Sequence, residues 1–241
     1  MPRTPLDAQV AGAVAWLKKH SSKSVRDGMS RYAIPNDHAL GVRMGDIQKL
    51  ARQLGRDHAL ALALWKTGVY EARMLSAYVD EPERVTAAQM DAQARDFDNW
   101  AVCDTLCFVL WYDTPHAFAK VRKWASHRDE FVRRAAFALL ASIALKDKTT
   151  GDAQFLRTLA FVGKAATDER NFVKKGVNWA LRGIGGRSLA LNQAAVALAK
   201  KLTLSPGPAA RWVGKDALRQ LGSAPVQRRL QKKAQAIAKS G

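Results

Sequence analysis

The segment 98–106, DNWAVCDTL, contains the pair of residues with the clearest potential for chemistry. Trp100 and Asp104 are four positions apart, so they share one face of a helix. A carboxylate beside an aromatic ring can stabilise an oxocarbenium-like transition state or orient a water molecule, as carboxylates do in glycoside hydrolysis. The alternative is structural, with Asp104 paired to Arg134 or to another nearby base. The sequence leaves both interpretations open.

A second indole stands in a basic segment, NFVKKGVNWALR. Trp179 has Lys174, Lys175 and Arg182 as near neighbours, whereas the aligned segments described below carry smaller side chains at this position. A lone tryptophan is most often a core residue. In a setting of this kind, however, an indole face attracts a bound cation by about 0.5 to 2 kcal/mol. Trp179 is therefore a candidate for contact with a cationic ligand.

Helices must position these residues, because helical periodicity runs along the whole chain and strand signals are scarce. Four segments begin with an aromatic residue, carry a basic residue three positions later and continue as an apolar, alanine-rich helix: YEARMLSAYV, FVRRAAFALL, FVKKGVNWAL and WVGKDALRQL. The shared basic residues are Arg73, Arg134, Lys175 and Lys215. WAVCDTLCFV, from Trp100, fits the same frame with Cys103 at the basic position.

These segments start 30, 31, 41 and 40 residues apart, and periods near 40 with two helices per unit are typical of HEAT-like α-solenoids. The predicted fold is all-α, a solenoid of HEAT-like helical repeats with a concave basic surface. We predict one domain over 1–241. Its repeat cores lie near 70–79, 100–109, 131–140, 172–181 and 212–221, and helices within 5–60 form an N-terminal cap.

The positive charge lies in one half of the chain. The sequence holds 39 Lys+Arg and 21 Asp+Glu, a net charge of +18. Residues 1–119 carry 14 of each sign, whereas residues 120–241 carry 25 basic and 7 acidic residues. A surface of single sign attracts polyanions, chiefly nucleic acid. An acidic membrane surface or ribosomal RNA is the alternative partner, although a membrane anchor would be a short segment.

Several function classes are disfavoured. No apolar run reaches the 18 residues of a membrane span, and the N-terminus MPRTPLDAQV has no secretory pattern, so we expect a cytoplasmic protein that associates with the nucleoid when it acts. Cys103 and Cys107 are interpreted as buried thiols rather than as a disulfide framework. The five histidines show no spacing typical of zinc ligands, so no metal site is predicted.

The sequence resembles the AlkD-like DNA alkylation repair glycosylases, which are built from HEAT-like repeats. The resemblance runs from about Val14 to Leu221 and rests on GVRMGDIQKLA, DNWAVCDTL, FVRRAAFAL and FVKKGVNWALR. The family pattern has a tryptophan and an aspartate four apart, then an arginine, then a second tryptophan. Trp100, Asp104, Arg134 and Trp179 match these four positions.

The resemblance implies a monofunctional glycosylase that releases cationic N3- and N7-alkylated purines from double-stranded DNA without base flipping. Asp104 would stabilise charge on the deoxyribose and guide water, and the two tryptophans would pack against the lesion's sugar and backbone. Arg134 would hold a phosphate or Asp104 itself. Further phosphate contacts are expected from a basic set: Lys174, Lys175, Arg182, Lys215, Arg43 and Arg133.

Two alternatives to the enzyme stay open. The first is a non-catalytic protein of the same fold that binds distorted or branched DNA. The second is a HEAT-like scaffold whose basic face meets an acidic protein. An acid in a basic groove favours the enzyme over the DNA binder, and the charge excess disfavours the scaffold. We expect no cofactor, no membrane partner and a monomer.

Overall fold

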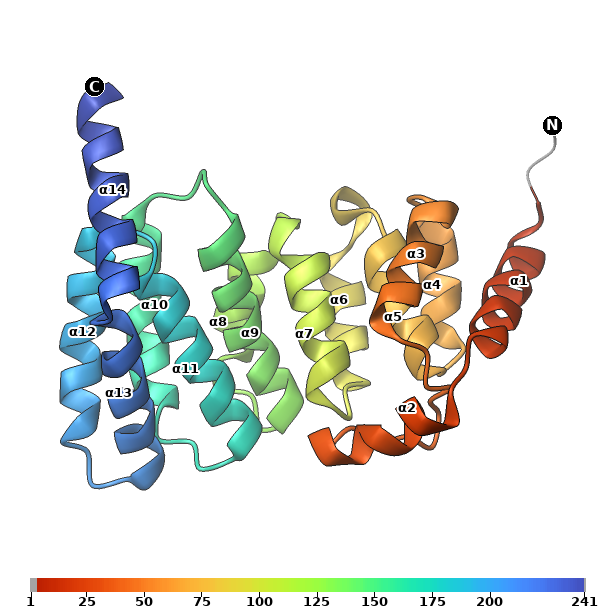
Figure 1. Ribbon diagram of the computed structural model, residues 1–241, viewed down its shortest axis with the longest axis horizontal. Coiled ribbons are helices and arrows are strands. Elements are labelled where there is room, and N and C mark those ends of the chain that lie inside the picture. Colours follow the sequence, from red (N-terminus) through yellow and green to blue (C-terminus); the bar gives the residue numbers. More distant parts are fainter. Residues whose placement is uncertain (1–3, 241) are drawn as a thin grey trace. The chain divides into compact units, whose positions relative to one another are not determined.

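A computed structural model describes residues 4–240, and over this range the chain forms fourteen α-helices, three short 3₁₀ helices and no strand (Figure 1). The prediction of an all-α fold is confirmed. The α-helices are α1 Leu6–Lys19, α2 Lys23–Gly28, α3 Met44–Leu54, α4 His58–Lys66, α5 Tyr70–Val79, α6 Ala87–Arg95, α7 Trp100–Val109, α8 Ala117–Trp124, α9 Glu130–Lys146, α10 Asp152–Ala165, α11 Asn171–Gly185, α12 Leu189–Thr203, α13 Pro208–Leu221 and α14 Ala224–Ser240. The 3₁₀ helices are Met29–Tyr32, Pro82–Arg84 and Trp111–Asp113.

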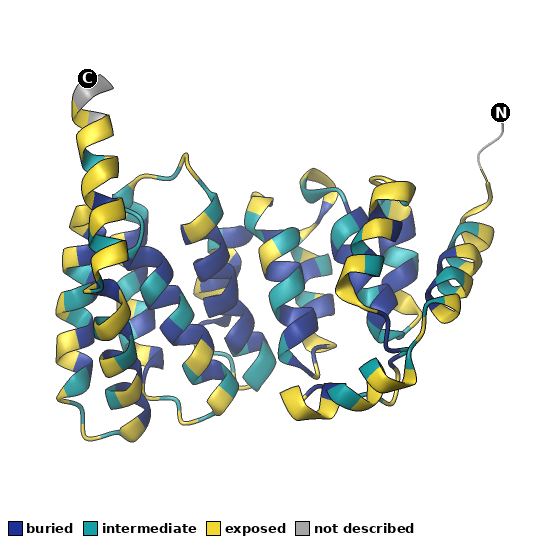
Figure 2. Ribbon diagram, viewed as in Figure 1, coloured by how far each residue is buried: buried dark blue, intermediate teal, exposed yellow. Residues whose placement is uncertain are grey.

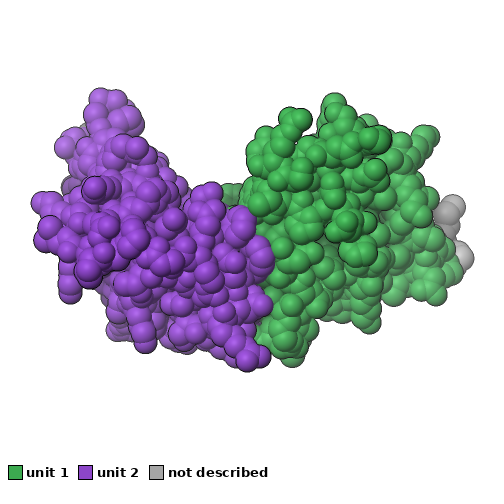
Figure 3. All heavy atoms as spheres, turned by 90° about the horizontal axis from the view of Figure 1, so that it is seen from below, with its two compact units in different colours: residues 1–115 green, residues 116–241 purple. Residues whose placement is uncertain are grey.

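The chain divides into two compact units, residues 1–115 and 116–241, which Figure 3 colours separately. In the first unit α5 packs against α3, α4 and α7, and α1 packs on α4. In the second unit α8 and α11 both pack against α9, and α12 pairs with α13. Each predicted repeat core lies in one helix, namely α5, α7, α9, α11 or α13.

Polar side chains mark where many helices begin. At six N-termini the side chain of the preceding residue accepts a hydrogen bond from a backbone N–H of the first turn, which satisfies a donor that the helix itself leaves unpaired. These capping residues are Ser22, Asp57, Thr86, Asn99, Asp129 and Ser188. Pro82 and Pro208 occupy first-turn positions, where the missing N–H of proline costs nothing.

Helix α9 forms the centre of the second unit. Its sequence, EFVRRAAFALLASIALK, is apolar on all sides after the first turn, and nearly every residue from Val132 to Ala144 is buried (Figure 2). A helix that is hydrophobic all round must be covered on every face. Gly176 and Gly183 on α11 face α9, and a Cβ added at either one would be only 3.4 to 3.5 Å from an α9 atom. The glycines thus allow the two helices to pack closely.

Other expectations concern features outside the repeats. Cys103 and Cys107 are buried and are not joined in a disulfide, which confirms their interpretation as buried thiols. Within residues 4–240, no helix combines the length and apolarity that crossing a membrane requires. Over the same range, no three side chains of the metal-binding types come together as a cation site.

Candidate functional site

The start of α7 holds the predicted tryptophan and aspartate. Asn99 precedes the helix, and its Oδ1 accepts hydrogen bonds from the N–H groups of Ala101 at 2.9 Å and Val102 at 3.0 Å. The Asn99 Nδ2 in turn donates to Asp98 Oδ1 at 2.6 Å. Because this cap fixes the first turn, Trp100 is the first residue of α7 and Asp104 lies one turn later on the same face, half-buried.

Trp100 is held by the N-terminal segment of the first unit. Its indole Nε1 donates to the carbonyl oxygen of Tyr32 at 2.8 Å. The ring is partly buried and packs, with Tyr70, against an apolar cluster of Met29, Ile34, Ala39 and Ala101. A hydrogen bond at one edge and apolar packing on the ring leave the indole little rotational freedom. The Trp100 indole therefore has a fixed orientation, one helical turn before Asp104.

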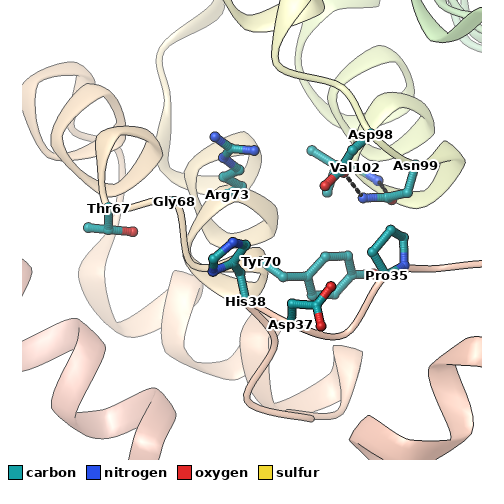
Figure 4. A pocket seen from close by; sticks show the side chains of 10 residues that line it. All are labelled: Pro35, Asp37, His38, Thr67, Gly68, Tyr70, Arg73, Asp98, Asn99 and Val102. Carbon is teal, nitrogen blue, oxygen red and sulfur yellow. Dashed lines mark hydrogen bonds between the residues drawn. The ribbon is translucent and has the colours of Figure 1, made fainter.

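A cavity of about 410 Å³ opens next to this start of α7, within the first unit. Three connections contribute its lining, those before α3, α5 and α7, and their side chains converge in Figure 4. The polar lining residues are Asp37, His38, Thr67, Tyr70, Arg73, Asp98 and Asn99. Burial raises the pKa of the Tyr70 phenol, and the carboxylates of Glu71 and Asp98 raise it further. The phenol thus stays protonated at neutral pH and is available as a hydrogen-bond donor.

Glu71 holds the loop that forms one side of this cavity. Its fully buried carboxylate accepts three backbone N–H bonds, from Leu40 at 2.9 Å, Gly41 at 2.7 Å and Val42 at 3.2 Å. Gly41 has a φ of +81°, and a Cβ there would be 2.2 Å from the carbonyl oxygen of Ser22. Only glycine fits this position. Glu71 was not among the residues predicted from the sequence, because an acid in the first turn of a helix is typical of a solvated position.

The other two predicted catalytic residues lie in the second unit, on the packed helices α9 and α11. Arg134 is buried, its Nη1 donates to the carbonyl oxygen of Phe172 at 2.7 Å, and its guanidinium lies 6.0 Å from the Phe172 ring centre. Its side chain runs over Gly176, where a Cβ would be 3.5 Å from Arg134 Cγ. Trp179 is half-buried on α11. Arg134 is therefore fixed by α11.

The predicted phosphate contacts differ in their surroundings. Lys175, Lys215 and Arg43 are exposed, and the half-buried Lys174 places its Nζ 5.3 Å from the Trp212 ring centre. Arg182 forms an ion pair with Asp216 at 3.4 Å. This set thus contains three solvent-accessible cations and two with an internal partner.

Arg133, the sixth residue predicted to contact phosphate, has two internal partners. It forms an ion pair with the buried Asp168 at 2.9 Å, and its Nε donates to the carbonyl oxygen of Ala125 at 3.0 Å. Burial alone would raise the pKa of Asp168, but hydrogen bonds and the charge from Arg170 outweigh it and lower this pKa, with a smaller contribution from the Arg133 guanidinium. These contacts tie the start of α9 to the connection before α11.

The basic residues at the shared repeat position do not form a uniform row of exposed charges. Lys175 and Lys215 are exposed. Arg73 instead lies 5.0 Å from the Trp65 ring centre, and Arg134 is buried. The charge division between the two units is the same as that between the sequence halves, because residues 116–119 carry no Lys, Arg, Asp or Glu. The first unit therefore holds 14 charges of each sign, and the second holds 25 basic and 7 acidic residues.

The profile of a family described as "DNA alkylation repair enzyme" matches residues 13–221. The chain belongs to this family. The match spans α7, α9, α11 and α13, and so includes every residue of the candidate site. Searching curated proteins by sequence gave no match.

Two solved structures are similar to this chain to different degrees. One comes from a family of proteins related to the HEAT-like repeat DNA glycosylases, with affinity for branched DNA structures. It is 16% identical, with a TM-score of 0.74 over 88% of this chain and 96% of its own. A designed armadillo repeat protein is 14% identical, with a TM-score of 0.31 over 82% of this chain and 99% of its own. The first likeness confirms the predicted class of HEAT-like helical repeats.

Proposed function

We propose that this member of the DNA alkylation repair family is a monofunctional DNA glycosylase. Its substrates are cationic alkylated purines in duplex DNA, N7-alkylguanine and N3-alkyladenine, and it acts without flipping the base into a pocket. The observation that carries the proposal is Asp104. It is a half-buried carboxylate one turn after a fixed tryptophan, within the segment that the family profile matches.

The chemistry requires little from the protein beyond electrostatics. The bond between C1′ of the deoxyribose and the purine nitrogen breaks, and its electron pair neutralises the cationic base. The oxygen of a water molecule bonds to C1′, and one water proton is released to solvent. Since the alkylated base already carries a positive charge, no general acid is needed. Positive charge builds on the sugar instead, and a nearby carboxylate stabilises it.

Each residue of the site has a role in this scheme. Asp104 faces the developing sugar cation and orients the attacking water. Trp100 and Trp179 pack against the sugar and backbone of the lesion. Arg134 is a positioning residue for α11, the helix that carries Trp179. Its guanidinium is buried and donates to the Phe172 carbonyl oxygen, so it is less suited to contact a phosphate.

Binding to the duplex is assigned to the excess charge of the second unit. Lys175 and Lys215 are exposed and are the first candidates for sequence-independent phosphate contacts. Lys174, Arg182 and Arg133 of the same unit complete the predicted set, together with Arg43 of the first unit. If six to ten phosphates are contacted, affinity falls about 10³- to 10⁵-fold between 50 and 200 mM salt.

The deciding experiment measures release of 7-methylguanine from methylated duplex DNA by the wild type and by Asp104→Asn. We expect the variant to release base at least about 10²-fold more slowly, the scale seen when one transition-state electrostatic contact is removed, with duplex affinity retained. Asp113→Asn makes the same chemical change at an exposed position of the first unit and should match the wild type. Unchanged release by Asp104→Asn would refute the mechanism.

A second candidate function is binding of branched or distorted DNA without catalysis. It is favoured by the solved relative with TM-score 0.74, which has affinity for branched DNA structures. Under this hypothesis the wild type releases no base, and a four-way junction competes away a linear duplex of equal length. Measuring both properties on one preparation separates the two candidates.

A further inference from the structure

The second unit contains a cavity of about 540 Å³ that is separate from the residues assigned to base release. It lies where the ends of α9 and α11, the connection 147–151 and the side of α14 meet. The glycine-rich turn GIGGRS contributes Gly183, Gly186, Arg187 and Ser188 to the lining. This turn ends α11, as its composition predicts, and the glycosylase scheme assigns it no role.

Four cations line this cavity: Lys148, Arg187, Arg229 and Lys233. In the part of the chain that the structure describes, none of the four is paired with a carboxylate. Arg187 is fixed by three backbone carbonyl oxygens, those of Ala144 at 2.9 Å, Asp147 at 2.6 Å and Thr150 at 3.0 Å. The Phe155 ring centre lies 4.1 Å from its guanidinium. The Arg187 guanidinium is therefore held in a fixed position in the lining of the cavity.

The other cations gather around this fixed arginine. Lys233 Nζ lies 3.5 Å from the carbonyl oxygen of Arg187, and Lys148 Nζ donates to that of Leu145 at 3.0 Å. A Cβ at Gly186 would be 3.0 Å from Arg229 Nη2, so the guanidinium sits over the bare backbone of this glycine. Burial lowers the pKa of Lys233, and repulsion from Lys148, Arg229 and Arg187 lowers it further. The four cations thus repel one another, and Asp147 and Asp152 act against this repulsion at Arg187.

The two acids of the lining, Asp147 and Asp152, accept hydrogen bonds from neighbouring residues. Asp147 Oδ1 accepts bonds from the Thr149 N–H and hydroxyl, each at 2.7 Å, and from the Thr150 N–H at 3.1 Å, within its own turn. Asp152 accepts a hydrogen bond from the Ser188 hydroxyl. Four positive charges therefore face two carboxylates, each of which already accepts hydrogen bonds at one of its oxygens.

We propose that this cavity binds a phosphate group. The Arg229 guanidinium and the two ammonium groups supply the forked and point-charge donors that phosphate oxygens accept. Arg187, whose guanidinium is held by three carbonyl oxygens, adds a fixed positive charge. An anion there would also relieve the repulsion among the four cations. The phosphate belongs either to a DNA backbone or to a small phosphorylated molecule. The proposal does not depend on the glycosylase chemistry, since none of its residues belongs to that site.

The test uses the full chain and the double variant Arg229→Gln/Lys233→Gln. Its matched control is Arg228→Gln/Lys232→Gln, which removes the same charge from neighbours on the same helix that do not line the cavity. Thermal unfolding is followed in sodium phosphate and in sodium chloride of equal ionic strength. We expect phosphate to raise the midpoint of the wild type and of the control, and to leave that of the site variant unchanged. At a concentration of 100 Kd, phosphate shifts the ratio of folded to unfolded protein about 100-fold.

Duplex binding over a range of salt then identifies the source of the phosphate. If the ligand is DNA, the slope of log K against log salt is smaller in the site variant than in the control, by about 0.9 for each phosphate that the variant no longer neutralises. Equal slopes together with a phosphate-specific rise in midpoint point to a small phosphorylated molecule. Equal slopes with no such rise overturn the proposal. Neither readout involves base release, so this result is independent of the glycosylase assay.

Discussion

Replacing Glu71 by glutamine tests how the loop beside Trp100 is held in place. The wild-type carboxylate is 0% exposed, with Oε1 shared by the N–H groups of Gly41 and Val42 and Oε2 bound to that of Leu40. Glutamine keeps one oxygen acceptor and presents an NH₂ group to the third N–H. A buried donor left unpaired costs about 1 to 3 kcal/mol. The two retained bonds lose charge assistance, which adds about 1 kcal/mol. Glu71→Gln should therefore lower the free energy of unfolding by about 2 to 4 kcal/mol.

Equilibrium urea denaturation measures this destabilisation, and amide hydrogen exchange locates it. Residues 40–42 should exchange faster in the variant, because their N–H groups lose an acceptor. Glu83→Gln makes the same change on an exposed side chain and should stay within about 0.5 kcal/mol of the wild type. A cost in Glu71→Gln as small as in this control, with unaltered exchange at 40–42, would show that the carboxylate does not hold the loop.

Two further predictions concern the second unit. Asp216→Asn removes the carboxylate that pairs with both Arg182 and Arg219, so at low salt the duplex should bind more tightly. The slope of log K against log salt should steepen by about 0.9 for each of these arginines that contacts a phosphate, and an unchanged slope would mean that neither does. Burial of Asp147 favours its neutral form, but hydrogen bonds from Thr149 and Thr150 outweigh this and lower its pKa to about 2. The resulting stabilisation, about 1 to 2 kcal/mol, is present above pH 4 and is lost as the pH falls toward 2. Denaturation of the wild type and Asp147→Asn should therefore differ at pH 7 and converge near pH 2, whereas a constant difference would refute this assignment.

The sequence predicted helix starts well because those signals are local. The repeat cores at 70–79 and 100–109 coincide with α5 and α7, since an aromatic first residue and an alanine-rich continuation reflect how each helix begins and packs. The family match over 13–221 likewise follows from segments that the sequence-based resemblance used. The turn GIGGRS was also predictable, because paired glycines end a helix whatever surrounds it.

Residues whose partners are distant in sequence were not predictable. Arg133 reads as an available cation, yet it pairs with Asp168, 35 positions away. Glu71 resembles a solvated acid of a first turn, and its burial depends on a loop about 30 residues earlier. The residues that line the cavity around Arg187 include some from α9, α11 and α14, which are far apart in the sequence. Periodicity determines which face of a helix is apolar, but it does not determine which polar side chain another segment will meet.

Under the proposed function, the separation of charge between the two units has a consequence for how the protein searches a duplex. All of the net charge of +18 lies in residues 116–241, whereas Trp100 and Asp104 lie in the neutral first unit. Contacts with phosphates are independent of sequence and permit one-dimensional diffusion along a duplex. The basic unit is thus suited to keep the protein on DNA during scanning, while the neutral unit is not held by strong nonspecific attraction at each step. The time that the protein stays on the duplex therefore falls as salt rises, and this dependence comes mainly from residues 116–241.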